Sequence, residues 1–225
     1  RASGCLARLF DVGVPAIIGA AMNNNVKAVR ALLNAGASYD VKHHGKSLLM
    51  IALSKLNDSM EKLLLRKIVK DGALDMLTHR DHEGMNVIGT AAYYGREIIE
   101  DIIGTLGTLS TLLNCGPNGA SALHIAAENG HANVARSLLY YGADPFLHDN
   151  GGKSPLFLAA SNGHPLAVLS LTFGCATTHE RIKDTLSTGI TPLHIAAQHN
   201  HFEIVETLLD FANHIGYSDF IDAKH

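Results

Sequence analysis

Large aromatic side chains are scarce in this sequence. Tryptophan is absent, and aromatic residues make up only 6% of the 225 residues, whereas hydrophobic residues make up 47%. The core must therefore be built mainly from Leu, Ile and Ala. Small and aliphatic side chains of this kind suit helices that pack closely against one another.

Cysteine is also rare. The three cysteines, Cys5, Cys115 and Cys175, are odd in number and far apart in the sequence. This favours a reducing compartment over a disulfide framework. We therefore expect the chain to act in the cytoplasm or the nucleus, or in the cytosol of a host cell if it is a secreted effector.

Positive charge is not concentrated anywhere along the chain. Lys and Arg number 18 against 21 Asp and Glu, a net charge of -3, and no basic block is present. A nucleic-acid groove requires clustered Lys and Arg, so we expect no nucleic-acid partner. No apolar run reaches the roughly 20 residues of a membrane span, so we expect no direct membrane insertion.

A short motif recurs along the chain about every 33 residues. In its clearest copy, Gly119 is followed four residues later by Leu123 and then by Ala126-Ala127. The same offset between a glycine and an apolar anchor occurs six times, with anchors at Ile17, Leu49, Ile88, Leu123, Leu156 and Leu193. Repeats of this length indicate stacked supersecondary units rather than one globular core.

Each unit is predicted to be a pair of helices followed by a loop. Thr191-Pro192 has the composition of an N-cap followed by proline at the first helical position. Asn129-Gly130 is expected to end a first helix, and residues 134–139 have the apolar spacing of a second helix. Gly142 then ends the second helix, and residues 148–151 have the composition of a protruding turn.

These strings resemble the ankyrin repeat. Residues 191–196 read Thr-Pro-Leu-His-Ile-Ala, and residues 138–144 read Leu-Leu-Tyr-Tyr-Gly-Ala-Asp, both similar to the motifs of that family. The resemblance covers about residues 11–214 and is weakest in the first three units. It implies an all-α solenoid of stacked helix-turn-helix units with protruding loops. The whole chain, residues 1–225, is interpreted as a single domain with units starting near residues 11, 43, 82, 117, 150 and 187, and as a fragment of a longer protein.

The resemblance also implies a binding function without catalysis or a cofactor. Ankyrin repeats bind another protein on the concave side, which is formed by the loop tips and the exposed ends of the first helices. The corresponding candidates at the tips are His43, His44, Lys46, His82, Glu83, Met85, Asn150 and Lys153. The candidates at the ends of the first helices are Tyr93, Tyr94, Glu128, Asn129, Asn162, Gln198 and His199.

Tyr93 and Tyr94 differ from the small or polar residues that most units place there. Tyrosine buries a large area at little entropic cost, which is typical of interface hot spots. The alternative is that a tyrosine fills a gap in the third unit, whose second helix is expected to be interrupted by Gly104 and Gly107.

Histidine is abundant, with 14 residues. The resemblance gives structural roles to five of them: His124 and His194 would bridge a first helix to the neighbouring loop, and His131, His164 and His201 would begin second helices. The pairs His43 and His44, His79 and His82, and His199 and His201 could be interpreted as metal ligands. Zinc requires three or four converging ligands, and no cysteine or carboxylate stands at ligand spacing, so no metal site is expected.

Three alternatives to a pure binding module remain open. A Cys-His hydrolase would use Cys115 or Cys175 as a nucleophile, although nothing in the sequence places a base beside either thiol. The module could instead recruit substrates for a larger enzyme or microbial effector, or form the cytosolic part of a membrane protein.

Two longer spacings indicate insertions. Residues 66–77 are expected either to lengthen a second helix or to form an extra turn, and residues 175–184 form the second insertion. Insertions between repeats map to loops and are often functional, and equally often they are tolerated additions without a function.

Overall fold

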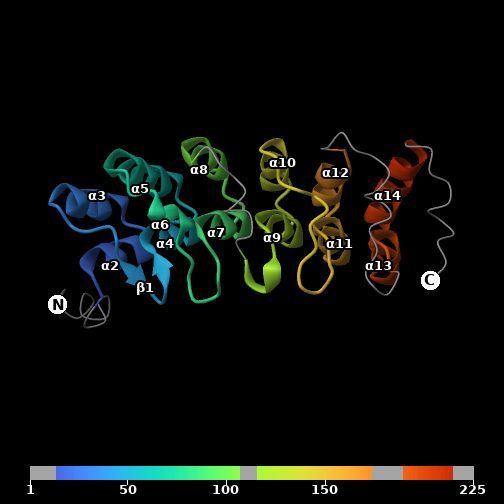
Figure 1. Cartoon of the computed structure of the whole chain (residues 1–225), viewed down its shortest axis with the longest axis horizontal. Helices are drawn as coiled ribbons and strands as arrows, with labels where there is room; N and C mark the ends of the chain where they lie inside the picture. The colour runs from blue at the N-terminus through green and yellow to red at the C-terminus, as the bar shows by residue number, and fades with distance from the viewer. Residues whose placement is uncertain (1–13, 107–115, 174–189, 215–225) are drawn as a thin grey trace, which may run out of the picture.

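The structure, a computed structural model, describes residues 14–106, 116–173 and 190–214. Its helices form two rows that run side by side along an elongated stack, with α2 and α14 at opposite ends (Figure 1). The first row consists of α2 (Ala16–Met22), α4 (Leu48–Ser54), α7 (Val87–Tyr93), α9 (Ala122–Glu128), α11 (Pro155–Ser161) and α13 (Pro192–Gln198). The second row consists of α3 (Val26–Asn34), α5 (Asp58–Asp71), α8 (Ile99–Leu106), α10 (Ala132–Tyr140), α12 (Pro165–Phe173) and α14 (Phe202–His214).

The all-α solenoid expected from the sequence is confirmed. Three short elements accompany the two rows in the described part of the chain: α6 (Asp75–Thr78), a 3-10 turn at Pro117–Gly119, and a hairpin of β1 (Lys42–His43) and β2 (Lys46–Ser47). The two strands pair antiparallel, with Lys42 opposite Ser47 and His43 opposite Lys46. The hairpin is a loop tip in extended form and does not change the fold class.

Polar side chains define where most of the first helices begin. In α4, α7, α9, α11 and α13 the residue before the helix accepts a hydrogen bond from a backbone N–H two or three residues into the helix, which otherwise has no partner. These N-cap residues are Ser47, Asn86, Ser121, Ser154 and Thr191. The predicted N-cap at Thr191-Pro192 is therefore present.

The core lies between and along the two rows. The paired alanines of the first helices are fully buried at Ala91-Ala92, Ala126-Ala127 and Ala159-Ala160. Because alanine has only a methyl side chain, neighbouring first helices approach closely there. The apolar anchors Leu49 and Leu123 are likewise buried, and together these residues join the units into one continuous core.

The first insertion takes both forms that the sequence left open. Helix α5 has 14 residues, ends at Gly72 in the left-handed conformation, and is followed by the extra turn of α6. The predicted interruption at Gly104 is wrong, because Gly104 lies inside α8. Gly107 and the second insertion, residues 175–184, lie outside the described residues.

Candidate functional site

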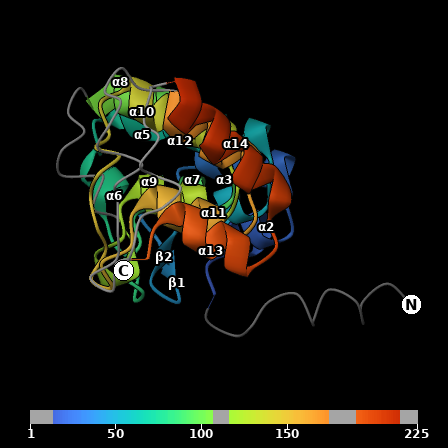
Figure 2. The same ribbon diagram turned by 90° about the vertical axis from the view of Figure 1, so that its right-hand side faces the viewer.

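The loops that join one unit to the next form one side of the candidate site. Looking along the stack, these loops lie together below and to one side of the helix rows (Figure 2). We call residues 42–47, 80–85, 116–120 and 148–153 the tip loops. Each immediately precedes a first helix, so its position depends on the start of that helix.

Successive tip loops contact one another. The Asn150 N–H donates to the carbonyl of Asn118 (2.9 Å), and the His79 imidazole donates through Nε2 to the carbonyl of Gly45 (3.0 Å). The His82 ring lies directly over Gly45, where a Cβ would come within 2.7 Å of its Cδ2. The tip loops therefore contact one another in pairs, the first with the second and the third with the fourth.

An aspartate shapes two of the tip loops in the same way; Asp81 is buried and Asp149 is half-buried. Asp81 Oδ1 accepts hydrogen bonds from the N–H groups of Glu83 (3.0 Å) and Met85 (2.9 Å). Asp149 Oδ1 accepts from the N–H groups of Gly151 (2.8 Å) and Lys153 (2.9 Å). Such turns hold the neighbouring side chains in defined positions before any partner binds.

His124 connects a first helix to the tip loop of the next unit. Its side chain is fully buried; Nδ1 accepts from the Ser121 N–H (3.1 Å), and Nε2 donates to the Lys153 carbonyl (3.0 Å). Burial lowers the pKa of His124, because the charged form would lose its hydration. The bridge that the resemblance implies is present, and it requires the neutral imidazole with its proton on Nε2.

The ends of the first helices form the other side of the candidate site. Tyr93, Glu128, Ser161 and Gln198 are the last residues of α7, α9, α11 and α13. The backbone carbonyls of the first three are held by histidines of the following unit. These histidines donate to the carbonyls as His131 to Tyr93 (3.0 Å), His164 to Glu128 (2.9 Å) and His201 to Ser161 (3.2 Å).

The two adjacent tyrosines have different surroundings. The Tyr93 side chain is 46% exposed, whereas Tyr94 is half-buried. Their rings meet edge to face, with centroids 5.0 Å apart. Tyr94 therefore supports Tyr93, and Tyr93 presents an aromatic surface to solvent at the end of α7.

The other candidates range from fully available side chains to partly structural ones. Glu83, Glu128, Asn150, Lys153 and Gln198 are exposed. Several others have local roles. Met85 packs against the core, and Lys46 lies half-buried in β2. Asn129 and Asn162 donate to the carbonyls of Ile125 and Glu128, and His199 donates to the Ser161 carbonyl. The rings of His43 and His44 meet edge to face, with centroids 4.1 Å apart.

The candidate residues form two lines of side chains, which we call the tip row and the helix-end row, rather than one patch. The tip candidates precede the first helices, and the second group stands at the opposite ends of the same helices. A seven-residue helix is about 10 Å long, so the two rows border a surface of about that width. A partner that contacts both rows must lie across the first helices.

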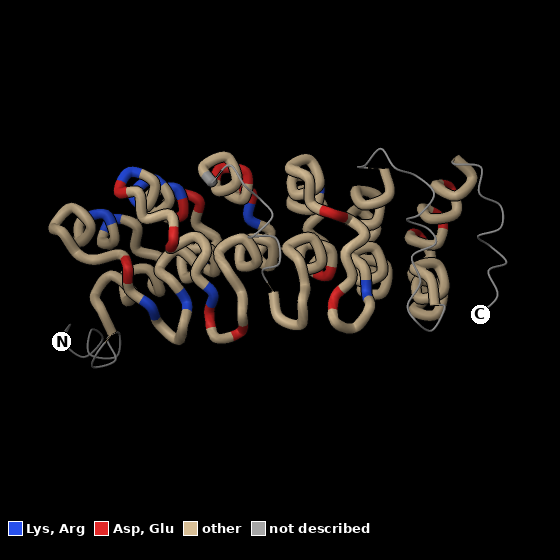
Figure 3. The backbone as a smooth tube through the Cα atoms, in the orientation of Figure 1, with Lys and Arg blue, Asp and Glu red and all other residues tan. Residues whose placement is uncertain are grey.

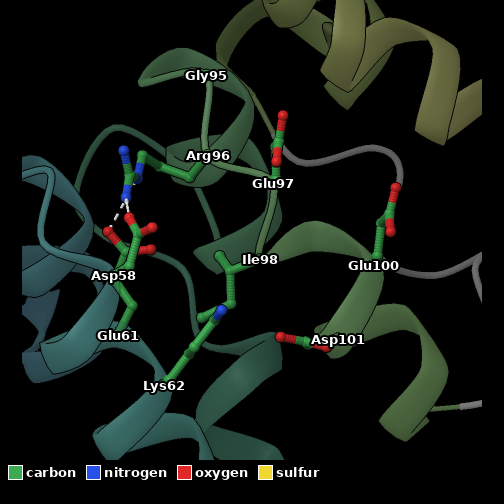
Figure 4. A pocket seen from close by; sticks show the side chains of 9 residues that line it. All are labelled: Asp58, Glu61, Lys62, Gly95, Arg96, Glu97, Ile98, Glu100 and Asp101. Carbon is green, nitrogen blue, oxygen red and sulfur yellow. Dashed lines mark hydrogen bonds and ion pairs between the residues drawn. The ribbon is translucent and has the colours of Figure 1, made fainter.

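A charged cluster that the sequence did not single out lies on the second row of helices. Arg96 donates through Nε to Glu61 Oε1 (2.9 Å) and also pairs with Asp58, both on α5 (Figure 4). Glu61 is only 2% exposed, and burial raises the pKa of its carboxyl while Arg96 opposes that change. The signal was available, because Gly95-Arg96 stands where later units have Gly-His, as at Gly130-His131.

Metal ligands, the two loop cysteines and membrane-spanning helices were the other features that the sequence raised. Within residues 14–106, 116–173 and 190–214, no group of three or more His, Cys, Asp or Glu side chains could hold a metal ion. Cys115 and Cys175 lie outside these ranges. No helix in the described part of the chain combines the length and the apolar character needed to cross a membrane.

Comparison with known families agrees with the paired helices and tip loops. The family profile described as Ankyrin repeats (3 copies) matches residues 62–149, 88–179 and 142–220, which together make up more than half of the chain. The chain belongs to the ankyrin repeat family. Ankyrin repeats are a protein–protein interaction fold and are generally non-catalytic.

Individual relatives match ankyrin repeats within longer proteins. Human NF-kappa-B inhibitor alpha is 36% identical over 115 residues, which cover 50% of this chain and 35% of that protein. The E3 ubiquitin-protein ligase XBAT32 of Arabidopsis thaliana is 36% identical over 93 residues, 41% of this chain and 16% of the ligase. The probable E3 ubiquitin-protein ligase XBOS32 of Oryza sativa subsp. japonica is 28% identical over 200 residues, 86% of this chain and 37% of the ligase. The chain thus spans well under half the length of these relatives.

A solved structure shows the same fold. The ankyrin repeat domain of Bcl-3, a member of the IkappaB protein family, superimposes with a TM-score of 0.66. It is 23% identical, and the match covers 88% of this chain and 86% of that domain.

Proposed function

We propose that this ankyrin repeat domain binds a partner protein across the exposed side of its first helices, between the tip loops and the helix ends. The observation that carries the proposal is that the tip row and the helix-end row run parallel and are each fixed by hydrogen bonds between units. The tip row is linked by His124 and Asn150, and the helix-end row by the histidines that hold the carbonyls of Tyr93 and Glu128. Side chains that are already ordered lose little entropy on binding.

Tyr93 is proposed as the main contact of this surface. It is the exposed aromatic residue at the centre of the helix-end row, and Tyr94 holds its ring in place. A preordered tyrosine can bury a large area at a small entropic cost. The neighbouring Glu128 adds a negative charge one unit further along.

The test compares two tyrosine pairs of the same geometry. Tyr140 and Tyr141 also meet edge to face, at 5.2 Å, and Tyr140 is 84% exposed, but they lie at the end of α10 in the second row. A photo-crosslinking amino acid at position 93 should capture a cytosolic partner that the same amino acid at position 140 does not. With that partner purified, Tyr93→Ala should weaken affinity by tenfold or more, and Tyr140→Ala should leave it unchanged.

The opposite results reject the proposed surface. If Tyr93→Ala lowers the melting temperature but leaves affinity unchanged, the tyrosine is a packing residue. Equal crosslinking at positions 93 and 140 would likewise show that the partner does not prefer the first-helix side.

A second proposal is that the domain recruits substrates for an enzyme on the same polypeptide. It is supported by the alignment with the plant ligase XBOS32, which extends over 86% of this chain. The partner captured at position 93 should then be modified by the full-length protein. An unmodified partner in that reaction would leave simple binding as the function.

A further inference from the structure

A groove runs between α5 and α8 on the second row of helices, away from the proposed binding surface. It consists of two connected hollows of about 420 and 510 Å³, which share Lys62 and Asp101 in their walls. Figure 4 shows the first hollow, with Arg96 and its carboxylate partners at one end and Lys62 and Asp101 at the other. We call the continuous space the outer groove.

Apart from Arg96 and the carboxylates of Asp58 and Glu61 that it pairs with, the two walls of the outer groove carry opposite charges. The α5 wall presents Lys62, Arg66 and Lys70, which recur every four residues and therefore lie along one edge of the helix. The opposite wall presents Glu97 and Asp101 at the same four-residue spacing. Figure 3 shows Lys and Arg together with acidic residues on α5, and acidic residues on α8.

Three aliphatic side chains line the outer groove among its polar residues. Leu65 and Ile98 line it and are each 5% exposed, and Val69 is 41% exposed beside Leu65. Exposed aliphatic area of this kind gains free energy when a partner covers it. The groove thus combines these aliphatic side chains with one basic and one acidic rim.

The opposite rims do not neutralise each other. Among the described residues, the ion pairs near the groove join Arg96 to Asp58 and Glu61, and no ion pair crosses from Lys62 or Arg66 to Asp101. The charges of the two rims therefore face the groove separately. A ligand that carries both signs can satisfy both rims at once.

We propose that the outer groove binds an amphipathic helix of a partner protein, with acidic residues along one edge and basic residues along the other. A helix is favoured over an extended peptide for two reasons. Both walls are helices whose backbone groups are already paired, so an extended peptide would find no backbone partners there. A helix also repeats its edge residues every three or four positions, which matches the spacing of Lys62, Arg66 and Lys70.

The test uses three synthetic 18-residue helical peptides with the same leucine face and a fluorescent label. The first carries Glu along one edge and Lys along the other, the second carries Lys along both edges, and the third carries Glu along both. Fluorescence anisotropy with the full chain at low salt should show the mixed-edge peptide binding about tenfold more tightly than the other two. Raising the salt concentration should weaken this binding.

Two double charge reversals should switch the preference. Lys62→Glu with Arg66→Glu leaves Lys70 as the one cation of the α5 rim and makes that rim net acidic, so the peptide with Lys on both edges should become the tightest. Glu97→Lys with Asp101→Lys makes the opposite rim net basic, so the peptide with Glu on both edges should become the tightest. Arg136→Glu, an exposed reversal on α10, is the matched control and should leave the original preference in place.

Several outcomes would overturn the proposal. They are equal binding of the three peptides by the unaltered chain, an unchanged preference in either double variant, or a switched preference in Arg136→Glu. A mixed-edge peptide with a central proline should bind more weakly, and equal binding would exclude a helical ligand. All four substituted residues are exposed, so the double variants should keep the melting temperature of the unaltered chain; these residues are Lys62, Arg66, Glu97 and Asp101.

Discussion

The regular units from α9 to α14 and the irregular units from α4 to α8 use the same sequence position differently. In the regular region, His131, His164 and His201 each donate to a backbone carbonyl at the end of a first helix in the preceding unit. In the irregular region, Arg96 occupies that position and reaches the carboxylates of Glu61 and Asp58 on the preceding second helix. In the regular region, neighbouring units are joined by hydrogen bonds to main-chain carbonyls along the first row of helices. In the irregular region, they are joined by ion pairs along the second row.

The difference has consequences for both stability and binding. A histidine that donates to a carbonyl contributes a modest net amount, because water offers a similar bond in the unfolded chain. A carboxylate buried as deeply as Glu61 depends on its partner, since it has lost its hydration. The charged arrangement also lies at one end of the outer groove, so in the irregular region these ion pairs border the proposed binding surface.

The largest expected effect is the loss of Arg96. Arg96→Met should lower the free energy of unfolding by about 3 kcal/mol, because it leaves Glu61 buried without its partner. The matched change in the regular region, His164→Ala, should cost only about 1 kcal/mol. Urea denaturation of the two variants measures both values.

A second variant distinguishes an unpaired charge from lost packing. Arg96→Met combined with Glu61→Leu should recover most of the stability, since no buried charge remains. If the double variant is no more stable than Arg96→Met, the contrast between the two regions does not arise from the ion pair.

A smaller effect is expected from adding a methyl group at two left-handed glycines. Gly130 in the regular region has φ of 75°, and a Cβ there would lie 2.6 Å from Nδ1 of His164. Gly130→Ala should cost about 2 kcal/mol, because backbone strain is added to a displaced histidine. Gly72 in the irregular region has φ of 70° and nothing within 4 Å of a Cβ, so Gly72→Ala should cost about 1 kcal/mol from strain alone. Equal losses on thermal unfolding would show that His164 moves aside freely.

The smallest expected effect is a change in how the free energy of unfolding depends on pH. The folded-state pKa of His124 lies below the unfolded value of about 6.5, so below that pH the unfolded chain takes up a proton that the folded chain does not. The stability from neutral His124 is complete above pH 6.5 and should fall by up to about 1.4 kcal/mol per pH unit as pH decreases toward the folded pKa. His124→Gln should remove this slope in urea unfolding between pH 7.5 and 5.5, and an unchanged slope would contradict the assignment.

Glu61 should make the free energy of unfolding depend on pH with the opposite sign. Its folded-state pKa is raised, so the folded chain binds the proton more tightly than the unfolded chain does. The stability linked to this proton is complete below the unfolded pKa and is lost as pH rises through the folded pKa. Glu61→Gln should therefore flatten the pH dependence above pH 4.5, whereas His124→Gln flattens it below pH 6.5.

Much of the regular region could be predicted from local sequence. Thr191 caps α13, and the paired alanines at Ala126-Ala127 form a fully buried face, as their spacing indicated. The length of α5 was left open, because residues 66–77 are compatible with both a longer helix and an extra turn. Gly104 was misread as a break, although a glycine inside a helix costs only about 1 kcal/mol and neighbouring contacts can compensate for it.

The candidate site residues show the same limit of what local sequence can predict. Tyr93 is exposed at a helix end, but Met85 packs against the core and Asn129 bonds to its own helix. Position within a repeat predicts which end of a helix a residue occupies. Exposure depends on the loops and side chains of the adjacent units, which are far away in the sequence.

The sequence by itself determined the repeated unit, the helix starts and the ankyrin fold, because these depend on capping, turn residues and apolar spacing within about 33 residues. Only the tertiary structure decided that Arg96 pairs with Glu61 and that α5 and α8 enclose a groove with rims of opposite charge. The physical reason is that electrostatic pairing and exposure depend on distances between units. Stacking sets those distances, and no single repeat contains them.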